Sequence, residues 1–431
     1  MKEVVGCARA LVDGVERRNF SFVVEEGVIA TAGERPQDLR DATLREFGDD
    51  AIVVPGFING HSHAYQILMR GWADDWPFER WRKDALYRVV PRLTPDDIYW
   101  TFVYAFSEML AAGITTVVEF FYLNGSGNEH AQAAIRAAED TGINLILART
   151  WMDAQTAPAA FRETIEEAAS RTAQLVAANP KTDICVAPHS LHGASREMVQ
   201  GAAAFAREHD CLLHIHVAEA PYEGERTRAL HGASPIDLLD RWDVLDNRLV
   251  AIHAIYVSDE EKKLIAKRRS RVVHNPTTNQ YLGDGVCDVP TFRNLGVPIA
   301  LGTDADVKPS LIDEMRAAAL MQKLARLDGA ALDSSTVFDF ATQQGARALG
   351  SNGGALSRGK SADYVVLDAS KIDPWSPPVN ALVYRGEDHW VRQAFVRGRA
   401  VYSRGDDPNT ALREHSRDAV GKIAQRLHLG G

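Results

Sequence analysis

The chain has few cysteines, four among its 431 residues, and no two of them form a C-x-x-C pair. Such scattered cysteines are typical of reduced, mostly buried thiols and not of a disulfide framework. The sequence also lacks an uninterrupted apolar run of about 18 residues, which a membrane-spanning helix requires. Its first segment shows no apolar stretch followed by a small-residue cleavage site, so we expect a cytoplasmic protein.

Positive charge is also scarce, because 48 lysines and arginines face 58 aspartates and glutamates, a net charge of −10. Without a basic run, the chain is a poor candidate for binding nucleic acid or an anionic membrane surface. Hydrophobic residues make up 45% and charged residues 25%, which is ordinary globular composition and excludes disordered, collagen-like and coiled-coil chains. We therefore expect an enzyme whose partner is a small-molecule substrate.

Short apolar, β-rich runs alternate with helical stretches along most of the chain. Eight such runs occur: Ile52–Asn59, Thr115–Phe121, Ile143–Arg149, Asp183–His189, Leu212–Glu219, Leu249–Ala254, Arg271–Pro276 and Pro298–Asp304. Their near-continuous apolar character predicts parallel strands covered on both faces. Eight strands alternating with helices predict an α/β fold, a (β/α)8 TIM barrel. An open doubly wound sheet is the alternative, and the placement of polar residues at the strand ends favours the barrel.

The two ends of the chain differ from this pattern, with short strands separated by glycine and aspartate turns. Neither end is long enough for a sizeable core of its own, so we expect them to pair into one small β-sandwich. The predicted division is residues 1–54 for its first half, 55–355 for the barrel, 356–405 for its second half and 406–431 for a C-terminal helix and tail.

Histidines and acidic residues stand at the ends of four predicted strands. His61 and His63 follow the first, and the fifth ends with His214, His216 and Glu219. The sixth ends with His253, and Asp304 and Asp306 stand at the end of the eighth. In a barrel these ends meet at one mouth, where catalytic groups collect. Imidazole and carboxylate groups together suit a divalent ion such as zinc.

The spacing of these residues favours particular ligands. Residues i and i+2 of an extended chain point to the same side, so His61 and His63 can reach one ion together. His214 and His216 share a face by the same rule. Because His216 is nearer the strand end, we take it as the ligand and His214 as its buried neighbour.

Several segments together resemble the amidohydrolase superfamily, above all its cytosine-deaminase-like aminohydrolases. The resemblance is carried by PGFINGHSHAYQILMRGWADD, HIHVAE, AIHA, HNPTTNQYLGDG and GTDAD. That group includes the s-triazine hydrolases, the guanine and S-adenosylhomocysteine deaminases and the N-formimino-L-glutamate deiminases. The resemblance spans nearly the whole chain and is more specific for the superfamily than for a substrate.

The resemblance implies a role for each strand-end residue. The metal ligands are His61, His63, His216 and Asp304. Glu219 matches the proton-shuttling acid of the deaminases, His253 contacts the attacking water or the substrate, and Asp304 takes up the water's proton. The fourth strand end, VAPHSLHG, lacks the lysine or carboxylate that bridges a second ion in two-metal relatives. We therefore expect one divalent ion, zinc or alternatively iron, and the resemblance also implies a homo-oligomer.

The implied reaction is hydrolytic deamination, in which ammonia leaves the amidine-like C–NH2 carbon of a purine, pterin, pyrimidine or triazine. Glu219 favours deamination over the dechlorination of triazine chlorohydrolases, some of which lack this acid. HNPTTN resembles the triazine and purine enzymes, whereas VVEFFY and PHSLHG resemble the N-formimino-L-glutamate deiminases. Deimination of an N-formimino amino acid and a triazine-type chlorohydrolase on the same scaffold therefore remain open alternatives.

Further polar and aromatic residues could contact the substrate, although each also has a structural interpretation. The candidates are Gln66, Trp72, Glu119, His189, His192 and Asn279. Trp72 belongs to a tryptophan-rich insertion between the first two strands that is expected to lie over the barrel mouth. Arg149, at the end of the third strand, would suit a substrate that carries a carboxylate.

Overall fold

The computed structural model describes residues 2–34 and 42–427 of the chain. One of its two sheets contains eight strands in sequential order, and every strand is parallel to its neighbours. They are β6 (Phe57–Ser62), β7 (Ile114–Phe121), β8 (Asn144–Trp151), β9 (Asp183–Pro188), β10 (Leu213–Val217), β11 (Leu249–His253), β12 (Arg271–His274) and β13 (Ile299–Leu301). Almost all of their residues are buried, as expected for parallel strands covered on both faces.

The two edges of this sheet meet beside the residues of interest. Ser62 and Asp304 form a parallel bridge between the end of β6 and the segment after β13. The His63 N–H donates to the Asp304 carbonyl oxygen at 2.8 Å, and the Asp304 N–H donates to that of His61 at 2.9 Å. These contacts join β13 to β6, so the predicted barrel is confirmed.

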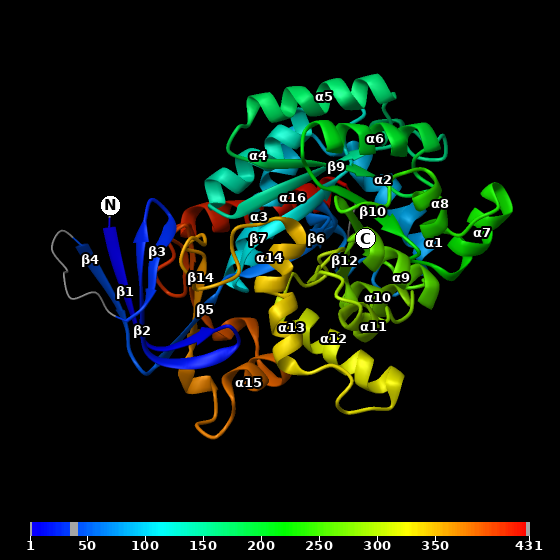
Figure 1. The fold of residues 1–431 in the computed structure, drawn as a ribbon. Helices are drawn as coiled ribbons and strands as arrows, with labels where there is room; N and C mark the ends of the chain where they lie inside the picture. Colours follow the sequence, from blue (N-terminus) through cyan, green and yellow to red (C-terminus); the bar gives the residue numbers. More distant parts are fainter. Residues whose placement is uncertain (1, 35–41, 428–431) are drawn as a thin grey trace.

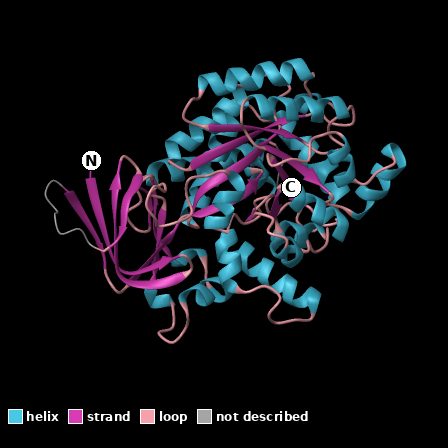
Figure 2. Cartoon of the chain, in the orientation of Figure 1, coloured by secondary structure: helices cyan, strands magenta, loops and turns pink. Residues whose placement is uncertain are grey.

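Helices surround the barrel strands (Figure 2). The longer ones are α3 (Pro95–Ala111), α4 (Glu129–Thr141), α5 (Ile165–Ala178), α6 (Arg196–Glu208), α7 (Pro221–His231), α9 (Asp259–Arg268) and α12 (Leu311–Arg326). Helices α3, α5 and α9 begin with capping boxes, in which Thr94, Thr164 and Ser258 accept a hydrogen bond from the third residue of the helix. Such caps satisfy N–H groups that would otherwise lack a partner at the helix start.

Both ends of the chain build the second sheet, which lies beside the barrel (Figure 1). Its strands are β1 (Lys2–Val12), β2 (Val15–Glu25), β3 (Val28–Gly33), β4 (Ala42–Phe47), β5 (Ala51–Pro55), β14 (Tyr364–Asp368), β15 (Val391–Val396) and β16 (Arg399–Ser403). Antiparallel pairing of β5 with β14 joins the two ends. Phe22, Tyr364 and Phe395 lie in a core of its own, with the last two rings stacked 4.4 Å apart. The expected joining of the two chain ends is confirmed.

The expectation of one strand over Ile52–Asn59 is wrong. The run is divided into β5, which pairs in the terminal sheet, and β6, which pairs in the barrel. The break falls at Gly56, whose N–H donates to the Asp363 carbonyl oxygen. A Cβ atom at this position would lie 2.1 Å from the Thr115 hydroxyl, so only glycine fits where the chain passes between the sheets.

The last described helix is α16 (Thr410–Arg426), which packs on α3. Its residue Arg426 forms an ion pair with Asp97 of α3. The last four residues of the predicted tail, 428–431, lie outside the described residues. No helix within the described ranges is both long enough and apolar enough to cross a membrane.

Candidate active site

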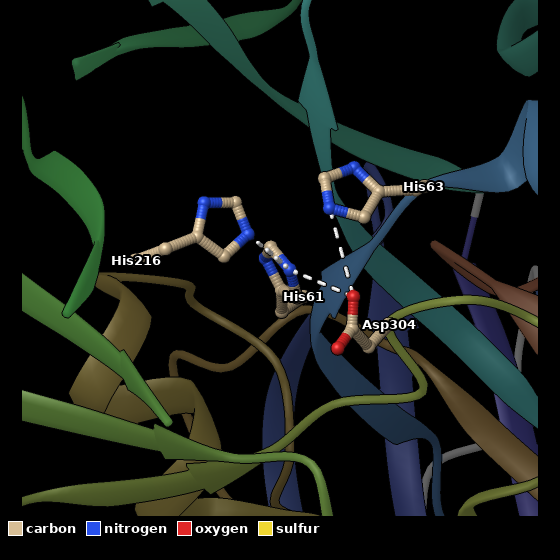
Figure 3. A group of neighbouring side chains, drawn as sticks. All are labelled: His61, His63, His216 and Asp304. Atoms are coloured by element: carbon tan, nitrogen blue, oxygen red, sulfur yellow. Dashed lines mark hydrogen bonds and ion pairs between the residues drawn. The ribbon is translucent and has the colours of Figure 1, made fainter. Parts of the chain in front are cut away.

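Four side chains converge at the barrel mouth (Figure 3). His61 and His63 come from β6, His216 from β10 and Asp304 from the segment after β13, and their possible ligand atoms all lie within 4.8 Å of one another. His61 Nε2 lies 3.2 Å from His216 Nε2 and 3.3 Å from Asp304 Oδ1. His63 Nε2 lies 3.6 Å from the same aspartate oxygen. All four residues are buried.

The hydrogen bonds of two of these histidines indicate that a cation belongs between them. His63 Nδ1 lies 2.8 Å from the Phe120 carbonyl oxygen, and His216 Nδ1 lies 2.9 Å from that of His189. Because a carbonyl oxygen only accepts, each Nδ1 carries the proton and each Nε2 turns its lone pair toward the centre. Burial lowers the pKa of His63 to about 3, so this imidazole is neutral and able to bind a metal. The nitrogen and oxygen donors therefore fit a divalent ion such as zinc.

The strand ends around this group have unusual backbone conformations. Ala218, His253 and Asp304 have φ angles of 53°, 72° and 55°, in the left-handed region that residues other than glycine rarely adopt. Each costs on the order of 1–3 kcal/mol and persists only where the surrounding structure holds it. Each of these residues follows or ends a barrel strand, so the barrel itself keeps the site residues in place.

Two further titratable groups adjoin the four. Glu219 Oε1 lies 3.4 Å from His253 Nε2, which in turn lies 3.6 Å from Asp304 Oδ2. Burial, together with the nearby carboxylates of Asp284 and Asp304, raises the pKa of Glu219 well above its ordinary value. Burial lowers the pKa of His253 to about 4. The site thus places a carboxyl group whose raised pKa favours its protonated form, and an imidazole whose lowered pKa favours its neutral form, beside the metal-binding group.

A cavity opens over this group, and its wall contains several residues predicted from the sequence. They are Gln66, His189, His192, His216, Glu219, His253 and Asp304. The Gln66 amide donates to the Tyr122 hydroxyl at 3.2 Å. Aromatic side chains complete much of the wall: Phe78, Trp81, Tyr87, Tyr122, Phe161 and Tyr281. A small, flat, partly apolar substrate suits such a wall.

Three predicted substrate contacts lie away from the cavity wall. Trp72 packs against Trp76 with ring centroids 5.5 Å apart. Glu119 is fully buried, and its Oε2 accepts a hydrogen bond from the Ala64 N–H at 2.9 Å. Asn279 lies behind His253, with its Nδ2 3.0 Å from His253 Nδ1. Glu119 and Asn279 are thus surrounded by protein groups, whereas Trp72 is partly exposed.

Arg149 forms a buried ion pair with Glu163. Its guanidinium makes two hydrogen bonds of 2.8 Å to the Glu163 carboxylate, and both side chains are fully buried. A bidentate pair of this kind holds the end of β8 against the loop before α5.

Two cavity residues, Arg82 and Arg226, were not anticipated from the sequence. Arg82 lies in the insertion after β6 and pairs with Glu79 at 2.6 Å, while Arg226 is an exposed residue of α7. The insertion that carries Arg82 is expected over the barrel mouth, so its positive charge was an available signal, whereas no sequence signal pointed to Arg226. Which side chains turn inward depends on the path of each loop, which periodicity does not specify.

The family model described as the amidohydrolase family matches residues 52–401. A 5'-deoxyadenosine deaminase from Methanothermobacter thermautotrophicus is 30% identical over 407 residues, covering 92% of each chain. A 5-methylthioadenosine/S-adenosylhomocysteine deaminase from Syntrophobacter fumaroxidans is 32% identical over 394 residues, covering 88% of this chain and 87% of its own.

Among solved structures, an adenosine deaminase from Xanthomonas campestris with bound zinc superposes with a TM-score of 0.87. It is 26% identical, and the match covers 98% of both chains. The similarity therefore includes the barrel, the terminal sheet and the strand ends that carry the site.

Proposed function

The chain belongs to the amidohydrolase family, and on this premise we propose that it is a metal-dependent deaminase of aminated purines. The observation that carries this proposal is the position of Glu219 and His253 beside the four metal-binding residues. The activities of the similar enzymes favour a 6-aminopurine nucleoside among the aminated heterocycles.

One divalent ion, most simply zinc, would be held by His61, His63, His216 and Asp304. When bound, such an ion acts as a Lewis acid and lowers the pKa of a bound water to about 7. The strand β9 ends at Pro188, followed by His189, and neither residue is the lysine or carboxylate that would bridge a second ion. This supports a single ion per chain.

Each residue around the ion has a separate role in the proton transfers of hydrolysis. Asp304 Oδ2 accepts the proton of the attacking water, and the His253 Nε2 hydrogen orients the water oxygen. Glu219, protonated because of its raised pKa, donates to the ring nitrogen next to the amino-bearing carbon and makes that carbon more electrophilic. As the water oxygen bonds to that carbon, Asp304 passes its proton to the amino group, and the C–N bond breaks to release ammonia. Glu219 takes the remaining hydroxyl proton, which forms the C=O bond and returns both residues to their starting states.

An ammonia-release screen tests the proposal. Purified protein with one equivalent of zinc is incubated with adenosine, 5'-deoxyadenosine, 5-methylthioadenosine, S-adenosylhomocysteine, guanine and an amino-chloro-s-triazine. We expect ammonia from at least one adenine nucleoside and no chloride from the triazine. Absence of ammonia from every aminopurine, or release of chloride alone, would contradict the proposal.

A second candidate is the deimination of an N-formimino amino acid. The cavity wall carries two arginines, Arg82 and Arg226, which could bind a substrate carboxylate. S-adenosylhomocysteine also carries a carboxylate. The two arginines therefore favour a carboxylate-bearing substrate but do not select between deamination and deimination. N-formimino-L-glutamate and N-formimino-L-aspartate therefore belong in the same screen.

Arg82→Gln should raise KM for carboxylate-bearing substrates about tenfold and leave KM for 5'-deoxyadenosine nearly unchanged. The lost interaction is a charged hydrogen bond at a partly exposed site, worth roughly 1.5 kcal/mol. The matched control is Lys83→Gln, an exposed neighbour outside the cavity wall. Equal effects on both substrate types, or equal effects of the two variants, would exclude a carboxylate contact at Arg82.

A further inference from the structure

Asn279 occupies a position behind His253, on the side away from the cavity. It lies on α10 (Pro276–Leu282) and is 1% exposed. Its Nδ2 lies 3.0 Å from His253 Nδ1 and 3.2 Å from Asp284 Oδ2. A second amide nitrogen, Nδ2 of Asn275, lies 3.4 Å from the same histidine nitrogen. His253 Nδ1 therefore faces two side-chain amide groups.

The carboxylate of Asp284 determines how the Asn279 amide is oriented. Burial raises the pKa of Asp284 to about 7, and in its ionised form its oxygens only accept hydrogen bonds, so the amide nitrogen and not the amide oxygen faces it. The same nitrogen faces His253 Nδ1, and its two hydrogens can serve one acceptor each. In this arrangement His253 Nδ1 accepts, which leaves its lone pair free of a proton.

The opposite side of the imidazole leads to the same assignment. His253 Nε2 faces Oε1 of Glu219 at 3.4 Å and Oδ2 of Asp304 at 3.6 Å. The ionised Asp304 oxygen only accepts, and the carbonyl oxygen of a protonated Glu219 also accepts, so both favour a hydrogen on the nitrogen that faces them. A neutral imidazole has only one such hydrogen. With that hydrogen on Nδ1, two nitrogen donors would oppose each other and a lone pair would face the carboxyl oxygens.

We propose that Asn279 is a positioning residue that holds His253 in the tautomer with its hydrogen on Nε2. This N–H then points toward Glu219 and Asp304, where the proposed reaction brings water and substrate together. The inference rests on the proposed function for its kinetic consequence, whereas the tautomer itself is a property of the protein without substrate. His253 has a φ of 72°, so its backbone is also held in a fixed, uncommon conformation.

Nitrogen-15 NMR of the zinc-loaded protein with labelled histidine tests the tautomer directly. The His253 signals are identified by their absence in His253→Asn. We expect an unprotonated Nδ1 and a protonated Nε2 in the wild-type protein. A protonated Nδ1 there would overturn the proposal, whatever the activity of the enzyme.

Asn279→Asp keeps the shape of the side chain and replaces the donor by an oxygen. We expect kcat to fall about 10- to 100-fold, as for other residues that orient a site histidine, with KM within about twofold and zinc content unchanged. We also expect His253 Nδ1 to become protonated. An unchanged kcat, or an unchanged His253 spectrum, would overturn the proposal.

Asn144→Asp is the matched control. The Asn144 Nδ2 donates to the buried Asp363 carboxylate at 2.9 Å, so this substitution also places an acid beside a buried acid. Asn144 is the first residue of β8 and lies at the opposite end of the barrel from the site. We expect lower stability but wild-type kcat and His253 signals. If the wild-type enzyme released ammonia from no substrate, the proposed function would fail while the NMR result still decided the role of Asn279.

Discussion

Glu219→Gln lowers kcat by about 10²- to 10⁴-fold without changing the metal content, if Glu219 is the acid of the reaction. Glutamine has nearly the same shape but cannot transfer a proton. Glu219 is not one of the four metal-binding residues, so the variant should keep its ion. Ammonia release and metal per chain are measured on the same preparation.

The pH dependence gives this prediction a second readout. Burial and the nearby carboxylates of Asp284 and Asp304 raise the pKa of Glu219 well above its ordinary value. A group with a raised pKa keeps its proton at pH values where an exposed carboxyl has lost it. Activity that needs the protonated acid should therefore persist toward neutral pH and fall as the pH rises through the raised value.

Glu225→Gln is the control for this experiment. Glu225 is an exposed residue of α7 outside the cavity wall, so its substitution should leave both the rate and the pH profile unchanged. If Glu219→Gln kept near wild-type rates, the proton-transfer role would be refuted. A loss of metal in the same variant would instead assign Glu219 to the metal site.

His216→Asn removes bound metal and lowers ammonia release by about 10³-fold or more, since Lewis-acid stabilisation is worth several kcal/mol. His216 Nε2 faces the shared centre, and its loss leaves three ligands, including only two of the three imidazoles. Metal content is measured by elemental analysis after dialysis against a weak chelator, and the rate is measured with and without added zinc.

His214→Asn is the matched control, because His214 lies two residues earlier on the same strand and is also fully buried. It is not among the four converging residues. We expect this variant to lose stability, as buried polar substitutions do, but to retain its metal. Metal retained by His216→Asn, or lost only from His214→Asn, would show that the wrong histidine was chosen.

Much of the barrel could be predicted from the sequence because parallel strands covered on both faces are short and apolar throughout. The same logic located the metal-binding residues, since parallel strand ends must meet at one mouth whatever the helices do between them. His61, His216 and Asp304 are separated by long stretches of chain, yet each follows or ends an apolar run.

The remaining features depend on contacts that periodicity does not encode. The run that becomes β5 and β6 is apolar in both sheets, so only the packing of Gly56 against Thr115 reveals the break. Asn279 belongs to the HNPTTN segment, but whether its amide faces the cavity or His253 depends on how α10 packs. Arg82 belongs to a loop whose turns bring it to the cavity wall.

The most direct test is an anomalous-scattering experiment on crystals grown with zinc and measured on both sides of the zinc absorption edge. We expect one strong peak per chain, about 2.0–2.2 Å from Nε2 of His61, His63 and His216 and from a carboxylate oxygen of Asp304. A peak elsewhere, a second ion in the same cavity, or an active enzyme without a peak would contradict it.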